Sequence, residues 1–258
     1  MLALLKRNFL LYFRNRSGVF FSLLGALISF VLYIIFLQKN LTDAWAQLPN
    51  SGPVLNNWLM SGTLAVTGIT TSLAALTQLV KDRERQVDQD LYLSDQGKWR
   101  LPFSYLTSAI IISFFMQALM YVLMCGYFRE VPALSLLPEV LLIMLLSSLL
   151  SSLVNAIFVY FFHSVDSLGK FSTIVGTASG FLVGTYVPLG VLPNFAQLLM
   201  KCTPATYIAA LYRQVLMKET LSETFKGQDN LLQEFQEKMG VQLKWQGLLT
   251  KENTYLIV

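Results

Sequence analysis

Few side chains in this chain could carry out chemistry of their own. The only histidine, His163, could act as the general base of a serine hydrolase with Ser179 as the nucleophile. These two residues fall on different apolar segments, with His163 at the end of its segment, so we do not expect them to meet. A nucleotide-binding loop needs GxxxxGK followed by Ser or Thr, whereas Gly97-Lys98 is followed by Trp99. The sequence therefore predicts no catalytic residue and no ATPase activity.

The long apolar segments carry no acidic or basic residue at their centres. Carriers driven by proton or sodium gradients usually place ionisable residues there, so we expect the energy for any transport to come from another protein. Cys125 and Cys202 are too few for a disulfide framework and show no metal-ligand spacing. We expect no metal and no cofactor in this chain.

The densest cluster of charge lies in the segment 81–101, KDRERQVDQDLYLSDQGKWRL, with five basic and five acidic residues up to Arg100. A solvated loop is the ordinary interpretation of such a run. Here the charges alternate and directly follow an apolar segment, which suits a helix docking on a cytoplasmic protein, where charge fixes the register. The candidate coupling residues are Asp82, Arg83, Glu84, Arg85, Asp88 and Arg100.

The elements that must position these residues are transmembrane helices. Hydrophobic residues make up 54% of the chain and charged residues 13%, and apolar runs of about 20 residues match the thickness of a bilayer. We predict an all-α integral membrane fold of about six spans, in one transmembrane domain over residues 17–258. The five complete spans are Ser17–Leu37, Leu59–Val80, Phe103–Phe128, Val140–Phe162 and Phe171–Leu192. The final Tyr255–Val258 resembles the first turn of a truncated sixth span.

The distribution of Lys and Arg predicts the orientation. With a cytoplasmic N-terminus, the short inner segments hold ten Lys or Arg and the two short outer loops hold two, as the positive-inside rule requires. We expect a multi-pass protein of the bacterial cell membrane, with 81–101 and His163–Lys170 inside. Asn40–Asn57, Arg129–Pro138 and the segment 218–252 should lie outside. The net charge of +4 then reflects topology, and we expect no nucleic-acid partner.

Residues 1–16 predict a basic amphipathic helix that lies in the membrane interface. Its apolar face carries Leu2, Leu5, Phe9, Tyr12 and Phe13, and Arg7 and Arg14 lie nearly opposite. This helix could simply anchor the first span, or could also dock beside a cytoplasmic partner.

The fifth span combines small residues with helix breakers. Gly176, Gly180 and Gly184 recur every four residues, a spacing that lets a second helix approach closely. Pro188 and Pro193 then break the helix, which at membrane depth is tolerated only inside protein or beside an aqueous cavity. We expect these five residues to serve helix packing or the translocation path, and residues 193–217 to form re-entrant helices. Gly25 has no glycine neighbour and is predicted to face lipid or loose packing.

The second span is rich in hydroxyl groups, from Ser61 to Thr77. Hydroxyls can bond back to their own helix, which would make this ordinary packing; the alternative is a face that lines a polar path or a subunit interface. Asn155 in the fourth span is expected to bond a neighbouring helix, because an amide in lipid is costly.

Two stretches carry specific residue patterns. The first reads Gly…Gly…Pro…Leu-Pro, then Pro-x-x-Tyr and Arg, at Gly180, Gly184, Pro188, Leu192, Pro193, Pro204, Tyr207 and Arg213. The second reads Asp-x-Glu, Leu-x-x-Ser and a basic residue, at Asp82, Glu84, Leu91, Ser94 and Arg100. Both patterns resemble those of one known family, the membrane permeases of type-2 ABC exporters, and the likeness extends over nearly the whole chain. The family's usual Ser-Pro is Ser94-Asp95 here.

The resemblance implies a working exporter of two permease subunits and two ATP-binding subunits, in lipid. The partner would bind ATP and Mg, and the charged segment and the N-terminal helix would transmit its movement. The substrate would be drug-like, lipid-like, a peptide or a glycan. The alternative is an ATP-independent channel or carrier for a small solute.

Overall fold

The computed structural model describes residues 1–258 apart from 46–50, 94–96, 130–133 and 246. Within these described residues the regular elements are helices, with one isolated antiparallel bridge between Lys244 and Leu248. The prediction of an all-α membrane fold is confirmed.

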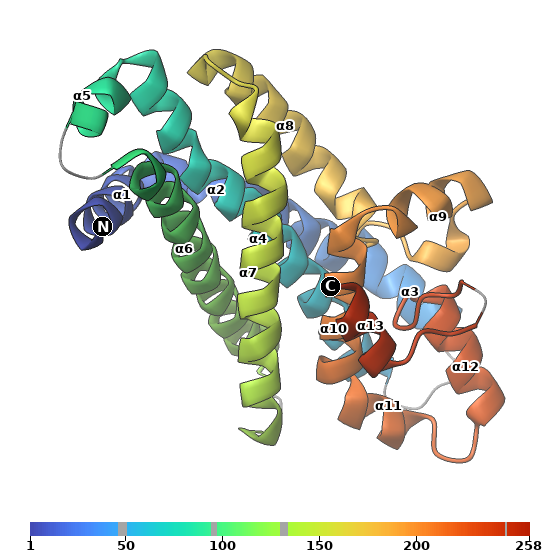
Figure 1. Cartoon of the computed structure of the whole chain (residues 1–258). Helices are drawn as coiled ribbons and strands as arrows, with labels where there is room; N and C mark the ends of the chain where they lie inside the picture. The colour runs from blue at the N-terminus through green and yellow to red at the C-terminus, as the bar shows by residue number, and fades with distance from the viewer. Residues whose placement is uncertain (46–50, 94–96, 130–133, 246) are drawn as a thin grey trace.

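The helices follow one another with few long connections (Figure 1). The first half contains α1 (Leu2–Arg14), α2 (Arg16–Leu32), the π-helical turn η1 (Tyr33–Leu37), α3 (Gln38–Ala44), α4 (Ser51–Glu84), α5 (Val87–Leu93) and α6 (Gly97–Phe128). The second half contains η2 (Leu134–Leu136), α7 (Leu137–Tyr160), α8 (Val165–Leu182), η3 (Leu189–Val191), α9 (Asn194–Lys201), α10 (Pro204–Leu216), α11 (Lys218–Thr224), α12 (Asp229–Lys238) and α13 (Lys251–Ile257).

Four helical stretches in the described part of the chain are long and apolar enough to cross a membrane: Arg16–Ala44, Ser51–Glu84, Trp99–Phe128 and Leu137–Tyr160. They contain the first three predicted spans, and the fourth, Val140–Phe162, except for its last two residues. The bounds of the fifth were wrong, because α8 begins at Val165 and ends at Leu182. The total number of spans stays a prediction, and so does the sixth span, since α13 is a seven-residue helix.

Helix α4 lies at the centre of the molecule. In its most apolar 18-residue window 89% of the residues are buried, against 28–44% in the other three candidate spans. Helices α2, α6, α7, α8 and α10 all pack against it. An unusually polar span is tolerated here because protein, not lipid, surrounds it.

The hydroxyl groups of α4 mostly bond to their own helix. Ser61 donates to the Asn57 carbonyl at 2.7 Å, and Thr71 donates to the Thr67 carbonyl at 2.6 Å. This supports ordinary packing over a hydrated path for these residues. Asn155 of α7 donates to Ser72 and to the Ile69 carbonyl, each at 2.9 Å. The predicted interhelical bond of Asn155 is therefore confirmed.

The chain breaks earlier than the prolines suggested. Gly184 has a φ of +70°, its N–H donates to the Phe181 carbonyl at 3.0 Å, and the Thr185 N–H donates to the Gly180 carbonyl at 2.9 Å. This pair of bonds is the Schellman arrangement that ends a helix at a left-handed residue, for which glycine is the least strained choice. Pro188 and Pro193 then precede η3 and α9.

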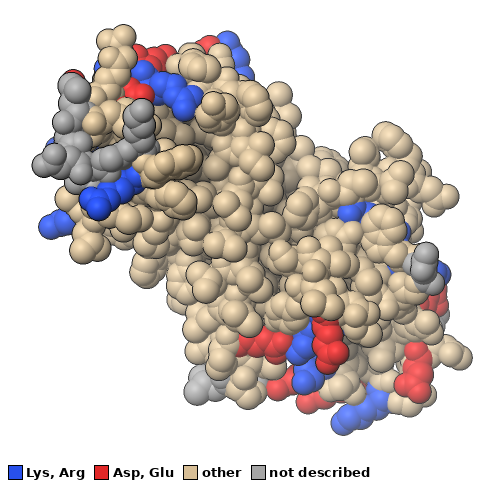
Figure 2. Space-filling view, viewed as in Figure 1, with Lys and Arg blue, Asp and Glu red and all other residues tan. Residues whose placement is uncertain are grey.

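Charged side chains gather at two ends of the face shown in Figure 2, and a band nearly free of charge lies between them. One end carries α1, α5 and the end of α4; the other carries α11 and α12 (Figure 1). This arrangement suits a bilayer across the middle of the molecule. Two short helices, α9 and α10, fill the predicted re-entrant segment 193–217, with Pro204 as the first residue of α10.

Candidate functional site

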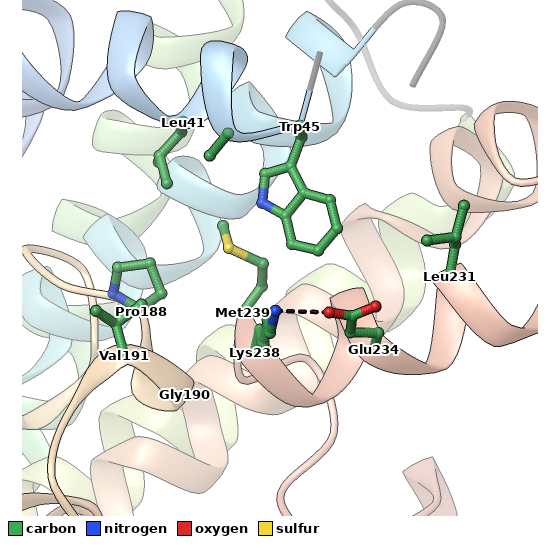
Figure 3. A pocket seen from close by; sticks show the side chains of 10 residues that line it. Leu41, Trp45, Pro188, Gly190, Val191, Leu231, Glu234, Lys238 and Met239 are labelled. Carbon is green, nitrogen blue, oxygen red and sulfur yellow. Dashed lines mark hydrogen bonds and ion pairs between the residues drawn. The ribbon is translucent and has the colours of Figure 1, made fainter. Parts of the chain in front are cut away.

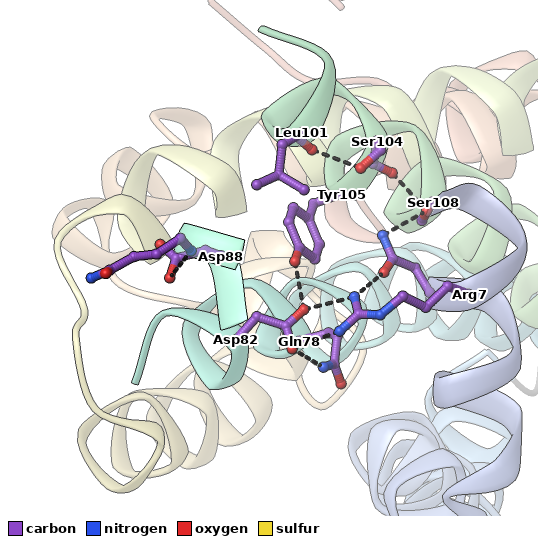
Figure 4. Close-up of polar contacts among 10 residues, drawn as sticks. Arg7, Gln78, Asp82, Asp88, Leu101, Ser104, Tyr105 and Ser108 are labelled. Carbon is purple, nitrogen blue, oxygen red and sulfur yellow. Dashed lines mark hydrogen bonds and ion pairs between the residues drawn. The ribbon is translucent and has the colours of Figure 1, made fainter. Parts of the chain in front are cut away.

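The last turn of α4 is a junction between four other helices, and Asp82 is its centre (Figure 4). Although charged, Asp82 is only 2% exposed. Its carboxylate accepts hydrogen bonds from both terminal nitrogens of Arg7 (2.8 and 2.9 Å), from Gln78 (2.7 Å) and from the Tyr105 hydroxyl. Bidentate Arg–carboxylate pairs are among the strongest and most directional polar contacts in proteins. The junction therefore fixes α1 and α6 to the end of α4.

Arg7 lies outside the candidate spans, and its hydrogen bonds to Asp82 raise its pKa above the usual value. It also donates to the Asn8 side chain, whose amide donates to Ser108 of α6 at 3.3 Å. The sequence pattern put Arg7 nearly opposite the apolar face of α1. The structure turns it toward α4, because a cation there neutralises a buried carboxylate.

The two residues after Asp82 hold the ends of α7 and α8. Arg83 donates to the carbonyls of Tyr160 (3.1 Å) and Phe162 (3.0 Å), just where α7 ends. Glu84 accepts the N–H of Val165 at 3.4 Å, the first residue of α8. A cation at a helix C-terminus and an anion at a helix N-terminus both complement the helix dipole. Three consecutive side chains thus connect α4 to α1, α6, α7 and α8.

The predicted coupling residues therefore fall into two groups. Asp82, Arg83 and Glu84 bind within the chain. Arg85 and Arg100 are exposed, and Asp88 is half-buried. Beside them lie two exposed aromatic side chains that the charge pattern did not reveal, Tyr92 (44% exposed) and Trp99 (79% exposed). Ser94 and Asp95 lie outside the described residues.

Near the other end of α4, a buried arginine binds the segment between α8 and α9, residues 183–193, which we call the break after α8. Arg213 of α10 is 1% exposed and donates to the carbonyls of Val183 (3.1 Å), Gly184 (2.9 Å) and Gly240 (3.1 Å). Its guanidinium lies 5.2 Å from the centre of the Trp58 ring, at the start of α4. The sequence pattern includes Arg213 but does not predict that this residue donates to carbonyls at the end of α8.

The three glycines predicted to form a stripe have different surroundings. A methyl group on Gly176 would meet nothing within 4 Å, whereas on Gly180 it would clash with the ring of Tyr186. Gly184 lies beyond the last residue of α8. The prediction for Gly25 was wrong, because Gly25 is buried and a methyl group on it would lie 3.1 Å from the Gly176 carbonyl oxygen. Helices α2 and α8 approach each other at these two glycines.

A pocket of about 350 Å³ lies between α3, the break after α8, and α12 (Figure 3). Leu41 of α3 and Trp45, the residue after α3, face this pocket. Lys238 of α12, which pairs with Glu234 at 2.6 Å, also faces it. A methyl group on Gly190 would lie 2.6 Å from the Cα of Lys238, so only glycine allows the break to pack this closely on α12. In the described part of the chain no group of His, Cys, Asp and Glu could hold a metal ion.

The sequence that forms these elements also matches a known family. The family model for the ABC-2 type transporter matches residues 1–217. The chain belongs to this family. Neither the curated proteins nor the solved structures gave a match.

Membership of the ABC-2 family makes the chain the membrane permease of an ABC transporter, a multi-pass membrane protein that works with an ATP-binding subunit. The match covers α1 to α10, and therefore both the Asp82 junction and the Arg213 contacts. Helices α11 to α13 lie beyond it.

Proposed function

We propose that this ABC-2 permease exports its substrate across the cytoplasmic membrane, driven by ATP that a separate subunit binds and hydrolyses. The observation that carries the proposal is the junction at Asp82. One polar cluster there links α1 and the end of α4, which hold the N-terminal helix and the charged residues predicted for coupling, to α6. The functional unit would contain two permease chains and two ATP-binding subunits. The substrate would be a drug-like or lipid-like compound, a peptide or a glycan.

In this proposal the ATP-binding subunit docks on the exposed surface around α5, which we call the α5 surface: Arg85, Tyr92, Trp99 and Arg100. Exposed aromatic and arginine side chains are enriched at protein interfaces, where they contribute much of the binding energy. The N-terminus and the α5 surface would then be cytoplasmic, and α9 to α12 external. ATP can shift the permease only if the assembly binds it with different affinity in its two conformations.

The central helix α4 gives this surface a physical connection to the outside. It is continuous from Ser51 to Glu84, 34 residues, or about 50 Å at 1.5 Å per residue. Asp82 lies at one end and Trp58, which contacts Arg213, near the other. A tilt of α4 would therefore move the junction and the break after α8 together.

Reconstitution tests the proposal. The chain is placed in lipid vesicles alone, and with an ATP-binding subunit that co-purifies with it, and flux of candidate compounds is followed with and without ATP. We expect flux only when both the subunit and ATP are present. Passage of solute by the chain alone would instead support a channel or carrier.

A further inference from the structure

Two cavities join into one groove along α4, between α2 and α8. The first, about 260 Å³, lies where the α1–α2 elbow, the end of α4 and the start of α8 meet. The second, about 330 Å³, continues along the same three helices. Ala74 and Thr77 line both cavities. The groove therefore has α4 as its floor and α2 and α8 as its walls.

The two ends of this groove differ in polarity. The end beside the Asp82 junction is lined by Lys81, Gln78, Asn15 and Tyr12. The rest is lined mainly by apolar side chains of α2 and by threonines of α4 and α8. These threonine hydroxyls bond within their own helices: Thr70 to Val66, Thr77 to Leu73 and Thr177 to Thr173. Because their hydroxyls are satisfied, these side chains need no water, and the groove suits a hydrocarbon chain.

The length of the groove matches one leaflet. Lys81 and Thr70 are eleven residues apart on α4, which is about 16 Å along a helix. Half of a hydrocarbon core about 30 Å thick is about 15 Å. The outer edge is open to the membrane, since Phe21 is 64% and Ile28 41% exposed.

The charge at the polar end favours an anion. Among the described residues Lys81 enters no ion pair, and Arg14 and Arg16 are exposed on the adjoining elbow. The carboxylates nearest to Lys81 in the sequence or the fold already have other partners. Asp82 binds Arg7, Glu84 accepts the N–H of Val165, and Asp166 binds Lys170. A lipid phosphate beside Lys81 would therefore meet a cation with no competing partner.

We infer that this groove holds one anionic phospholipid, with its phosphate at Lys81 and an acyl chain against Thr70, Thr77 and Thr173. The lipid lies in the leaflet that faces the Asp82 junction, which is the inner leaflet in the proposed topology. It fills the space on α4 between α2 and α8 and leaves the walls in contact at Gly25 and Gly176.

Lipid exchange on the purified full-length chain tests the inference. The protein is equilibrated with vesicles of phosphatidylglycerol or of phosphatidylcholine with the same acyl chains, and the lipid that each chain retains is counted by native mass spectrometry. We expect about one phosphatidylglycerol per chain. One cation near the membrane surface contributes about 1 kcal/mol, so Lys81→Gln should weaken retention about fivefold and remove the preference for phosphatidylglycerol. Lys170→Gln, at an exposed ion pair, should retain lipid like the native chain.

The acyl-chain site needs its own variant. Thr173→Trp places a large ring in the groove and should reduce retention of both lipids, whereas Ile174→Trp, exposed on another face of α8, should not. Native retention in both Lys81→Gln and Thr173→Trp would overturn the inference. So would a Thr173→Cys chain that forms disulfide-linked dimers in full yield, because a second copy would then cover the groove. Co-purification of the ATP-binding subunit, measured on the same samples, reports on the proposed function separately.

Discussion

Arg7 and Asp82, 75 residues apart along the chain, form a bidentate ion pair with hydrogen bonds of 2.8 and 2.9 Å. The carboxylate of Asp82 is almost fully buried, since 3% of this side chain is exposed. The pair makes the N-terminal helix part of the transmembrane bundle, not a separate anchor. A movement that reaches α1 from a partner would therefore reach α4 directly.

Removing the cation of this pair should destabilise the permease. Arg7→Ala leaves a buried carboxylate with two neutral donors, and breaking a buried ion pair of this kind costs about 3–5 kcal/mol. Because the Arg7 side chain is 30% exposed, we expect a loss nearer to 1–3 kcal/mol. Thermal unfolding of the purified chain measures the loss, with the exposed Arg14→Ala as control.

A double-mutant cycle separates the pair from its surroundings. In an Asp82→Asn background, Arg7→Ala should cost clearly less, with a coupling free energy of about 0.5–3 kcal/mol. Equal effects of Arg7→Ala in both backgrounds would mean that Arg7 acts independently of Asp82.

The α5 surface should matter for assembly and not for stability. Trp99→Ala combined with Arg85→Glu should reduce co-purification of the ATP-binding subunit at least about tenfold, since interface hot spots cost about 2 kcal/mol or more each. Phe195→Ala is the matched control, because Phe195 is 73% exposed on α9, at the opposite end of α4. Native co-purification of the double variant would place the docking surface elsewhere.

The carbonyls held by Arg213 make its replacement costly. Arg213→Met keeps an unbranched side chain but leaves three buried carbonyls without a donor, at about 1–3 kcal/mol for each one that stays unsatisfied. We expect a lower melting temperature and a lower membrane yield, with Lys218→Met at an exposed position unchanged. If Arg213→Met unfolded at the native temperature, the break after α8 would not depend on this side chain.

The effect of replacing each glycine on stability and membrane yield should depend on the atoms around it and not on the spacing of the glycines in the sequence. Gly184→Ala forces a side chain into the left-handed region and should cost about 1–2 kcal/mol. Gly176→Ala should be neutral, because its methyl group meets open space. Gly25→Leu should reduce membrane yield, since it would force α2 away from α8. Equal yields for Gly25→Leu and native protein would show that this crossing is not required for folding.

Sequence patterns predicted the features that depend on local chemistry. Hydropathy located the four candidate spans, and the cost of an amide in lipid predicted the interhelical bond of Asn155. The prolines predict an end of α8 that is too late, because Gly184 ends the helix before them. The partners of Asp82 and Arg213 could not be predicted, since Arg7 and Gly240 reach them only through tertiary packing. The buried position of Gly25 was missed for the same reason.

The central claim is that the ATP-binding subunit drives the permease through the Asp82 junction and α4. Distances between two spin labels, measured by pulsed electron paramagnetic resonance, test it most directly. The chain lacks Cys125 and Cys202 and carries one label at Leu10 on α1 and one at Phe195 on α9. We predict that a non-hydrolysable ATP analogue shifts this distance in the complex with the ATP-binding subunit and not in the chain alone, and that Arg7→Ala reduces the shift. The same distance with and without the analogue in the complex would contradict the account.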